Sequence, residues 1–415
     1  MIKETTKTKK VATKTATVAL PELNIGILGH VDHGKTTLTQ MLTGKFTDEH
    51  SEELKRGISI RLGYADMTIN KCPKCSGAAA YSTFSKCFIC GSDTKHLRTL
   101  SVVDVPGHET LMATVLTGAS LLDGAILVIA ANEKCPQPQT KEHLAVLNIS
   151  GIKNIIIVQN KIDLVDAKGA KENYDSIKTF LKGSVAENAP IIPISAQHKA
   201  NIEVLLNAIQ DILITPKHDS KKNPKMIVAR SFDINKPGKK IKDLIGGVVG
   251  GSIVDGAFKP GDEIELRPGI KQNNDWAAIK TKILSINKGK TSVMQGTSGG
   301  LVALSTTLDP YVAKSDSLVG TVIGLPGKMP PVWKTLKLEI NIIDGLHDTK
   351  ENILKNDPIL MSVGTARTIG VCTQPGKTSD FILKLPVCAD ISDKVALSKQ
   401  IAGRFRLIGY GIVKK

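Results

Sequence analysis

The chain has 415 residues, 41% of them hydrophobic, which suits about two to four ordinary globular domains and excludes a largely disordered protein. It has neither an apolar run of the ~18 residues that a transmembrane helix needs nor the apolar core of a signal peptide, so we expect a cytoplasmic protein without a membrane partner. The formal net charge of +16 favours an anionic partner, most commonly nucleic acid, and the 4% of aromatic residues favours phosphate and shape contacts over base stacking.

The first twenty residues form a basic, threonine-rich stretch with five lysines and one glutamate. Such a segment buries too little apolar surface to offset the entropy of ordering it, so we expect disorder over residues 1–20. Its sequence is compatible with an arm that contacts RNA and equally with a solubilising leader.

Residues 21–216 alternate between short apolar runs and segments with helical spacing, a pattern typical of a mostly parallel, doubly wound α/β sheet. The expected strands are Leu23–Leu28, Leu62–Ile69, Thr99–Val103, Ala125–Ala130, Asn154–Val158 and Pro190–Ile194. The expected helices are Lys35–Thr43, Glu109–Leu122, Thr140–Asn148 and Ile202–Leu213. Ligands of such sheets bind at the carboxyl ends of the strands.

A phosphate-loop pattern, Gly-His-Val-Asp-His-Gly-Lys-Thr, follows the first expected strand at residues 29–36 and opens the first expected helix. Glycines allow backbone N–H groups to face phosphate, and the helix N-terminus adds partial positive charge. Lys35 can reach the terminal phosphates, and the hydroxyl of Thr36 can ligate Mg2+.

Two C-x2-C pairs, Cys72/Cys75 and Cys87/Cys90, follow with 11 residues between them. Four thiolates at this spacing suit a tetrahedral, closed and therefore structural Zn2+ site in an insertion at residues 71–91. Disulfides and an iron–sulfur centre are the alternatives, and a reducing compartment and the spacing disfavour them. The remaining Cys135, Cys372 and Cys388 are expected to be small buried side chains.

Three further motifs follow expected strands in the order of a guanine-nucleotide site: Asp-Val-Pro-Gly-His at 104–108, Asn-Lys-Ile-Asp at 160–163 and Ser-Ala-Gln at 195–197. Asp104 can hold the water shell of a metal, and Gly107 allows close backbone approach to a γ-phosphate. Asp163 can accept from the two donors of guanine, which adenine lacks. The nucleotide contacts that we expect are Asp32, His33, Gly34, Lys35, Thr36, Thr37, Asp104, Gly107, Asn160, Lys161, Asp163, Ser195, Ala196 and Gln197.

Beyond residue 216 a polar, basic linker leads into short β-like runs broken by Gly and Pro, a cadence typical of antiparallel barrels. A second break falls at Leu325–Pro331. We therefore expect a tail at 1–20, a nucleotide domain at 21–216 and two β-barrels at 217–328 and 329–415. The runs are Gly246–Val254, Asp262–Leu266, Gly300–Leu304, Leu318–Ile323, Thr335–Ile342, Ile359–Val363, Phe381–Leu385 and Phe405–Val413.

The nucleotide motifs resemble those of translational GTPases such as elongation factor Tu. This resemblance implies activator-dependent hydrolysis of GTP to GDP and phosphate, with His108 positioning the attacking water. It also implies a first switch at residues 55–60, where Ser59 stands in place of the threonine that many relatives carry. In this reading Asp32, Thr36, Gly57 and Ser59 approach Mg2+.

The cysteine insertion makes the chain similar to the gamma subunits of translation initiation factor 2, as do stretches such as residues 132–140, 230–238 and 400–411. The resemblance runs from about residue 21 to the end, and the absence of long extensions suggests an archaeal version. It implies the GTP-binding core of a heterotrimer with alpha and beta subunits. Such a subunit carries methionylated initiator tRNA to the small ribosomal subunit and is switched off by hydrolysis.

Two other functions stay open at this point. A selenocysteine-tRNA elongation factor is a similar GTPase that usually carries a further C-terminal domain, whereas this chain stops at Lys415. A non-catalytic scaffold that senses GTP and assembles a complex belongs to a different class. Initiator-tRNA binding separates the first alternative from a gamma subunit, and hydrolysis measured with and without ribosomes separates the second.

Overall fold

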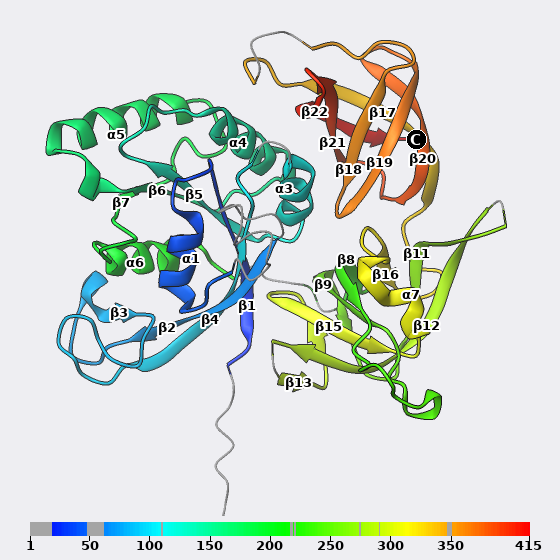
Figure 1. The fold of residues 1–415 in the computed structure, drawn as a ribbon, viewed down its shortest axis with the longest axis horizontal. Helices are drawn as coiled ribbons and strands as arrows, with labels where there is room; N and C mark the ends of the chain where they lie inside the picture. Colours follow the sequence, from blue (N-terminus) through cyan, green and yellow to red (C-terminus); the bar gives the residue numbers. More distant parts are fainter. Residues whose placement is uncertain are drawn as a thin grey trace, which may run out of the picture.

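A computed structural model describes residues 19–47, 62–108, 111–215, 219, 221–273, 275–289, 291–346 and 351–415. The chain folds into an α/β domain followed by two β-barrels (Figure 1), which confirms the predicted fold class. Among these residues no helix is both long and apolar enough to span a membrane.

The α/β domain is built on a seven-stranded sheet with strand order β3-β2-β4-β1-β5-β6-β7. Five neighbouring strands are parallel, as the alternating pattern predicts. From β4 onward a helix connects each strand to the next and returns the chain to the same edge, whereas β4 itself is reached from the antiparallel β2. They are β1 (Pro21–Gly29), β4 (Lys95–Asp104), β5 (Gly124–Ala130), β6 (Ile155–Asn160) and β7 (Ile191–Pro193). β2 (Gly63–Lys71) and the short β3 (Tyr81–Ser82) join antiparallel at one edge.

Helices cover both faces of this sheet, so its central strands are buried throughout. Successive residues of β5 enter different cores: Leu127 packs with α3, α4 and α5, whereas Ile126 and Val128 pack with α1 and α6. The helices span α1 (Lys35–Thr43), α3 (Met112–Ala119), α4 (Pro138–Ser150), α5 (Ala167–Leu181) and α6 (Ile202–Ile212). The short η3 (Ile162–Leu164) follows β6.

Two helices differ from the sequence expectation. The helix expected from residue 109 begins at Met112 and ends at Ala119, and residues 109–110 lie outside the described part of the chain. We did not predict α5, because most of its sequence is polar and it buries only Asn173, Ile177 and Leu181. The Asp166 side chain caps this helix by accepting a 2.7 Å hydrogen bond from the Gly169 N–H.

The first barrel closes through the pairing of β11 with β12, in the order β11-β16-β8-β9-β15-β12, with β13 added beside β12. A two-stranded sheet of β10 (Ala257–Phe258) and β14 (Gly296–Thr297) accompanies it, with η4 (Ile241–Asp243), α7 (Pro310–Ala313) and η5 (Lys314–Asp316) in the connections. The barrel strands are β8 (Lys225–Phe232), β9 (Val248–Asp255), β11 (Glu263–Gln272), β12 (Asp275–Lys288), β13 (Thr291–Val293), β15 (Leu301–Thr306) and β16 (Val322–Gly324).

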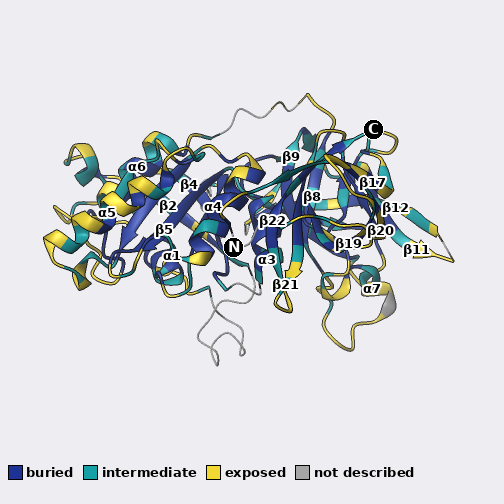
Figure 2. Ribbon diagram, turned by 90° about the horizontal axis from the view of Figure 1, so that it is seen from above, coloured by how far each residue is buried: buried dark blue, intermediate teal, exposed yellow. Residues whose placement is uncertain are grey.

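The second barrel is a closed antiparallel sheet in the order β17-β20-β19-β18-β21-β22. Closure pairs every strand on both sides and so leaves no sheet edge exposed. Its strands are β17 (Val332–Ile342), β18 (Pro358–Val363), β19 (Ala366–Gln374), β20 (Thr378–Cys388), β21 (Lys394–Ile401) and β22 (Arg404–Lys414). Dark, buried strands run through all three bodies in Figure 2. As expected, Cys135, Cys372 and Cys388 are buried.

Polar contacts join the second barrel to the nucleotide domain. Arg406 of β22 forms an ion pair with the fully buried Glu142 of α4, with 2.7 Å between Nε and Oε1. Arg367 of β19 donates to the hydroxyl of Thr117 on α3 over 3.2 Å. α3 and α4 therefore each hold one arginine of the second barrel.

Candidate functional site

The nucleotide motifs meet at one edge of the sheet. β1 ends at Gly29, β4 at Asp104 and β6 at Asn160, and all three strands point in the same direction. The loops that leave them are therefore neighbours in space, although up to 131 residues separate the motifs in sequence. This is the edge at which parallel α/β sheets bind ligands.

The phosphate loop is shaped by residues in left-handed conformations. Gly34, with φ of 88°, directly precedes α1, and a Cβ there would lie 2.4 Å from Nδ2 of Asn160, so only glycine fits. Asp32 is also left-handed, with φ of 60°, and its side chain is exposed. The Lys35 ammonium donates a 2.6 Å hydrogen bond to the His30 carbonyl and thus lies across the loop. Thr36 and Thr37 occupy the first turn of α1 and are half-buried.

Asn160 joins the phosphate loop to the Ser-Ala-Gln loop. Its buried side-chain amide donates to the His33 carbonyl over 2.9 Å, and its side-chain oxygen accepts from the Ala196 N–H over 3.0 Å. One side chain therefore uses both ends of its amide to fix two loops of the site, which explains an asparagine at this position.

Asp163 lies in η3, next to Lys161 in a left-handed conformation with φ of 64°. Its side chain is 27% exposed, and Nε2 of His198 lies 3.7 Å from its carboxylate. A hydrogen bond from the Ser195 hydroxyl lowers the pKa of Asp163, so the carboxyl is ionised and able only to accept. An acceptor pair at this place matches the N1–H and exocyclic amine of guanine. Gln197 is exposed beside this loop.

The Asp-Val-Pro-Gly-His motif packs against the phosphate loop. Asp104 is buried and its carboxylate accepts a 2.8 Å hydrogen bond from the Thr47 hydroxyl. A Cβ on Gly107 would lie 2.4 Å from Nζ of Lys35 and 2.9 Å from the Gly29 carbonyl oxygen, so this glycine allows the two motifs to touch. His108 is half-buried, and its carbonyl accepts from the Leu111 N–H. The two expected first-switch residues, Gly57 and Ser59, lie outside the described residues.

Two buried histidines, His33 and His143, hold the phosphate loop against the core. His33 is 1% exposed, its Nδ1 lies 3.0 Å from the Val128 carbonyl, and burial lowers its pKa to about 4. Its side chain is thus part of the core, and only its backbone can face a phosphate. His143 of α4 accepts a 2.8 Å hydrogen bond from the Gly29 N–H through Nδ1, and burial lowers its pKa to about 3. We did not predict His143 as a site residue, and only its position in an expected helix could have indicated it.

The four cysteines of the insertion come together. All four Sγ atoms lie within 4.8 Å of one another, with 3.5 Å between Cys72 and Cys90 and 3.8 Å between Cys75 and Cys87. A tetrahedral site with Zn–S bonds of about 2.3 Å requires S–S edges of about 3.8 Å, so the thiols fit Zn2+. Hydrogen bonds with Ser92 lower the pKa of Cys90 to about 6, whereas hydrogen bonds with Cys90 raise the pKa of Cys75 to about 12, so it is the geometry of the four sulfurs that indicates a metal. Residues 77–80 of the insertion (η1) pack against α6.

Comparison with known proteins shows which families the chain resembles. Residues 21–215 match the family model of the elongation factor Tu GTP binding domain, and residues 334–413 match that of initiation factor eIF2 gamma, C terminal. The translation initiation factor 2 subunit gamma of Methanocaldococcus jannaschii is 58% identical over 95% of this chain and 97% of its own length. That of Pyrococcus horikoshii is 55% identical over 95% and 98%.

Solved structures with the same arrangement are more distant in sequence. Elongation factor SelB from Methanococcus maripaludis, in complex with the GTP analogue GppNHp, superposes with a TM-score of 0.73 at 24% identity, over 96% of this chain and 80% of that chain. A bacterial selenocysteine-specific elongation factor has the same TM-score, 0.73, at 25% identity, over 95% of this chain and 58% of its own.

Proposed function

Because this chain belongs to the family of translation initiation factor 2 gamma subunits, we propose that it carries methionylated initiator tRNA to the small ribosomal subunit in a GTP-dependent manner. The observation that carries the proposal is 58% identity to a gamma subunit over nearly the whole of both chains. The chain is a translational GTPase, with GTP or GDP and Mg2+ as its ligands and four cysteines that can bind Zn2+.

The site explains how the chain's residues hold a nucleotide. The loop of residues 29–36 presents backbone N–H groups at the start of α1, where the helix dipole favours negative charge. Lys35 neutralises the terminal phosphates, and Thr36 and Asp32 are placed to serve Mg2+. Asp163 selects guanine, and Asn160 holds the base-binding loop and the phosphate loop together through its two hydrogen bonds. Bound GTP supplies the γ-phosphate, whose presence or absence distinguishes the two states of the factor.

The change of state reaches the second barrel through α3, which follows the Asp-Val-Pro-Gly-His motif, and through α4, which contacts the phosphate loop. Gly107 touches Lys35, and α3, which follows this motif, holds Arg367 of the second barrel. α4 holds the start of the phosphate loop through His143 and the same barrel through Glu142. A γ-phosphate that displaces Gly107 therefore alters the contacts of α3 with the second barrel. Docking of the second barrel in turn favours one position of the loop that carries Gly107.

We assign the catalytic role to His108, which follows Gly107 in the Asp-Val-Pro-Gly-His motif and precedes α3, the helix that begins at Met112. A group that orients the attacking water contributes in the transition state and hardly in the ground state. His108→Ala should leave GTP affinity nearly unchanged and slow ribosome-activated hydrolysis by about 10²–10⁴-fold. Single-turnover hydrolysis with small ribosomal subunits measures this, and a variant as fast as the wild-type protein removes the assignment.

Further parts of the proposal rest on the family. The alpha and beta subunits are the expected partners in a heterotrimer, and work on the ribosome implies a cytoplasmic location. We place the domain boundaries at 21–216, 217–328 and 329–415, which is supported by β8 beginning at Lys225 and β17 at Val332.

A filter-binding assay tests the carrier role. The chain, assembled with its alpha and beta subunits, should retain Met-initiator tRNA with GTP far better than with GDP, and better than elongator Met-tRNA. Equal retention of both tRNAs contradicts the proposal. Preference for selenocysteinyl-tRNA would move the chain to the function named for its structural relatives, although its identity to them is only 24–25%. Absence of hydrolysis even with ribosomes would support a scaffold.

A further inference from the structure

The chain has only 15 aromatic residues, yet three of them, Tyr81, Phe84 and Phe88, lie in one stretch of eight residues inside the cysteine insertion. Phe84 and Phe88 are 43% and 40% exposed, and the adjacent Ile89 is 62% exposed. The two phenyl rings stand edge to face, with 5.4 Å between their centroids and 82° between their planes. Exposure of large apolar side chains costs hydration free energy, so a group of them on a small insertion indicates a surface that is covered by a ligand.

The rings are held in place. The Phe84 carbonyl accepts hydrogen bonds from Nδ2 of Asn70, over 3.1 Å, and from the Thr94 hydroxyl, over 2.8 Å. Phe88 directly follows Cys87 and stands two residues before Cys90, so two of the four thiols fix the backbone on either side of it. A surface that is already ordered loses little conformational entropy when a ligand binds.

A lysine lies beside one of the rings, and the insertion as a whole is basic. Nζ of Lys199 lies 5.8 Å from the centroid of the Phe84 ring. Residues 71–98 contain five basic side chains and only one acidic one, Asp93, which pairs with Lys86 over 2.7 Å. Zn2+ with four thiolates has a net charge of about −2, so the loaded insertion stays positive before Lys199 is added. Lys71, Lys74, Lys86 and Lys95 of residues 71–98 are exposed, as is Lys199.

From these observations we infer that the knuckle face, which we define as Phe84, Phe88, Ile89 and Lys199, binds single-stranded RNA. Aromatic rings beside lysines are the elements with which proteins hold unpaired strands, since each base stacks on a ring and its phosphate meets a cation. Bases in a duplex are stacked on one another and cannot reach the rings, so the ligand is unpaired. The perpendicular rings receive two neighbouring bases that are splayed apart.

The size of the apolar patch favours RNA over a protein partner. The exposed parts of Phe84, Phe88 and Ile89 amount to roughly 300 Å², taking about 200 Å² for a large side chain. A stable protein interface covers about 800 Å² on each partner, whereas two or three stacked bases need no more than this patch. An acidic protein segment remains the alternative that the experiment must exclude.

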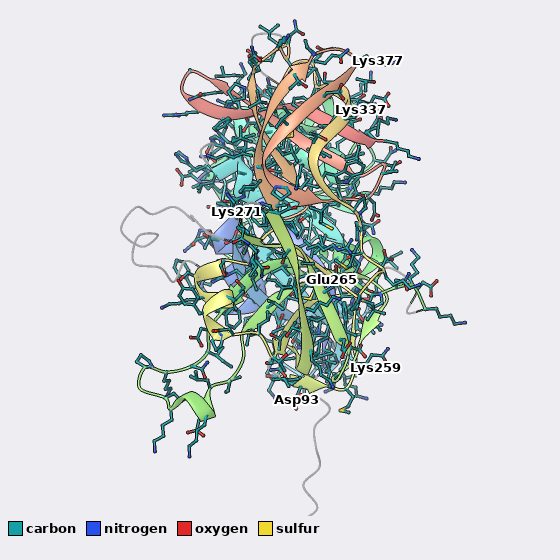
Figure 3. The ribbon with its side chains drawn as sticks, turned by 90° about the vertical axis from the view of Figure 1, so that its right-hand side faces the viewer. Asp93, Lys259, Glu265, Lys271, Lys337 and Lys377 are labelled. Carbon is teal, nitrogen blue, oxygen red and sulfur yellow. The ribbon has the colours of Figure 1, made fainter. Side chains whose placement is uncertain are left out.

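The insertion that carries the rings of the knuckle face also lies away from the second barrel (Figure 3). Asp93 of the insertion lies at the opposite end of the molecule from Lys337 and Lys377 of the second barrel (Figure 3). Lys199 lies two residues beyond Gln197, in the turn that carries the Ser-Ala-Gln motif. RNA on this face therefore contacts the loop that closes over the guanine base, at a distance from the second barrel (Figure 3).

The test measures binding of a fluorescent twelve-nucleotide oligouridylate to the full chain, loaded with Zn2+ and GTP, by anisotropy at several salt concentrations. The Phe84→Ala/Phe88→Ala variant should bind about ten- to a hundredfold more weakly. Tyr311→Ala is the matched control, because it removes an aromatic ring that is 80% exposed on the first barrel, and its affinity should equal that of the wild-type protein. Lys199→Ala should reduce the salt dependence by about one phosphate contact.

Zinc content and GTP affinity, measured in parallel, show whether each variant is folded. If the double alanine variant loses zinc, Phe84→Tyr/Phe88→Tyr and Lys199→Ala decide: the tyrosines should preserve RNA affinity and Lys199→Ala should lower it. Equal affinities of the double alanine variant and Tyr311→Ala overturn the proposal. Weakened binding of the alpha or beta subunit with unchanged RNA affinity also overturns it, in favour of a protein interface. Initiator-tRNA binding is a separate readout and should not change.

Discussion

Replacement of Arg406 by alanine should release the second barrel from the nucleotide domain. The Glu142 carboxylate is fully buried, and its Oε1 lies 2.7 Å from Nε of Arg406, which is itself 21% exposed. Without the guanidinium a carboxylate remains in the interior with its charge uncompensated, which costs about 3–5 kcal/mol. Since about 1.4 kcal/mol corresponds to a factor of ten, the equilibrium between docked and undocked barrel should shift by roughly 10²–10³-fold or more.

The result can be followed by limited proteolysis near residues 325–331, where the chain enters the barrel, and by small-angle scattering of the GTP-bound protein. Lys394→Ala is the matched control. Its ammonium donates to the Asn148 carbonyl of the same helix over 3.4 Å but is exposed, so its loss should cost less than about 1 kcal/mol. Replacing both partners, as Glu142→Leu/Arg406→Met, should restore most of the docking, because no buried charge is left alone.

The reasoning is refuted if Arg406→Ala and Lys394→Ala are equally protected from protease and equally compact. It is also refuted if the double replacement is no more compact than Arg406→Ala alone, because the loss would then stem from packing of the arginine stem and not from the stranded carboxylate.

Three further predictions concern the sites. Asp163→Asn should weaken GTP binding by about 1–3 kcal/mol and improve binding of xanthosine triphosphate, because it exchanges an acceptor for a donor; equilibrium titration with both nucleotides checks this, and unchanged GTP affinity contradicts it. The purified chain should contain about one Zn2+, and its removal by a chelator should raise hydrogen exchange selectively in residues 71–98; elemental analysis that finds iron or no metal refutes the assignment. Burial lowers the pKa of His33 from 6.5 in the unfolded chain to about 4 in the folded one. Between these pH values the unfolded chain therefore binds more protons, and the free energy of unfolding should fall by up to about 3 kcal/mol as the pH drops from 6.5 to 4. Denaturation followed at several pH values should show a smaller loss in His33→Gln, and an equal loss in both proteins contradicts the assignment.

Much of the fold follows from local patterns in the sequence. The run Ala-Ile-Leu-Val-Ile-Ala at 125–130 is apolar at every position, because both faces of a central parallel strand are covered, and the structure has the strand there. Glycine and lysine at 34 and 35 predict the start of α1 to the residue. The cysteine spacing predicts a cluster that the structure forms with all four sulfurs within 4.8 Å of one another. Elements with polar sequences were harder to predict: α5 has 15 residues and buries only three of them, so few apolar side chains mark it.

What the sequence determined by itself is therefore the set of nucleotide motifs, their order, the family and the zinc-binding cysteines, since each depends on residue type at short spacing. The tertiary structure alone decided which distant residues support them. Nothing in the sequence near 143 or 406 indicates that His143 accepts from the first residue of the phosphate loop or that Arg406 reaches the buried Glu142, 264 residues away. The exposure of the Phe84 and Phe88 rings was likewise decided only by the tertiary structure, because a sequence gives the number of aromatic residues but not their exposure. Contacts of this range depend on how helices and barrels pack, and a local pattern cannot encode the position of a partner that it does not contain.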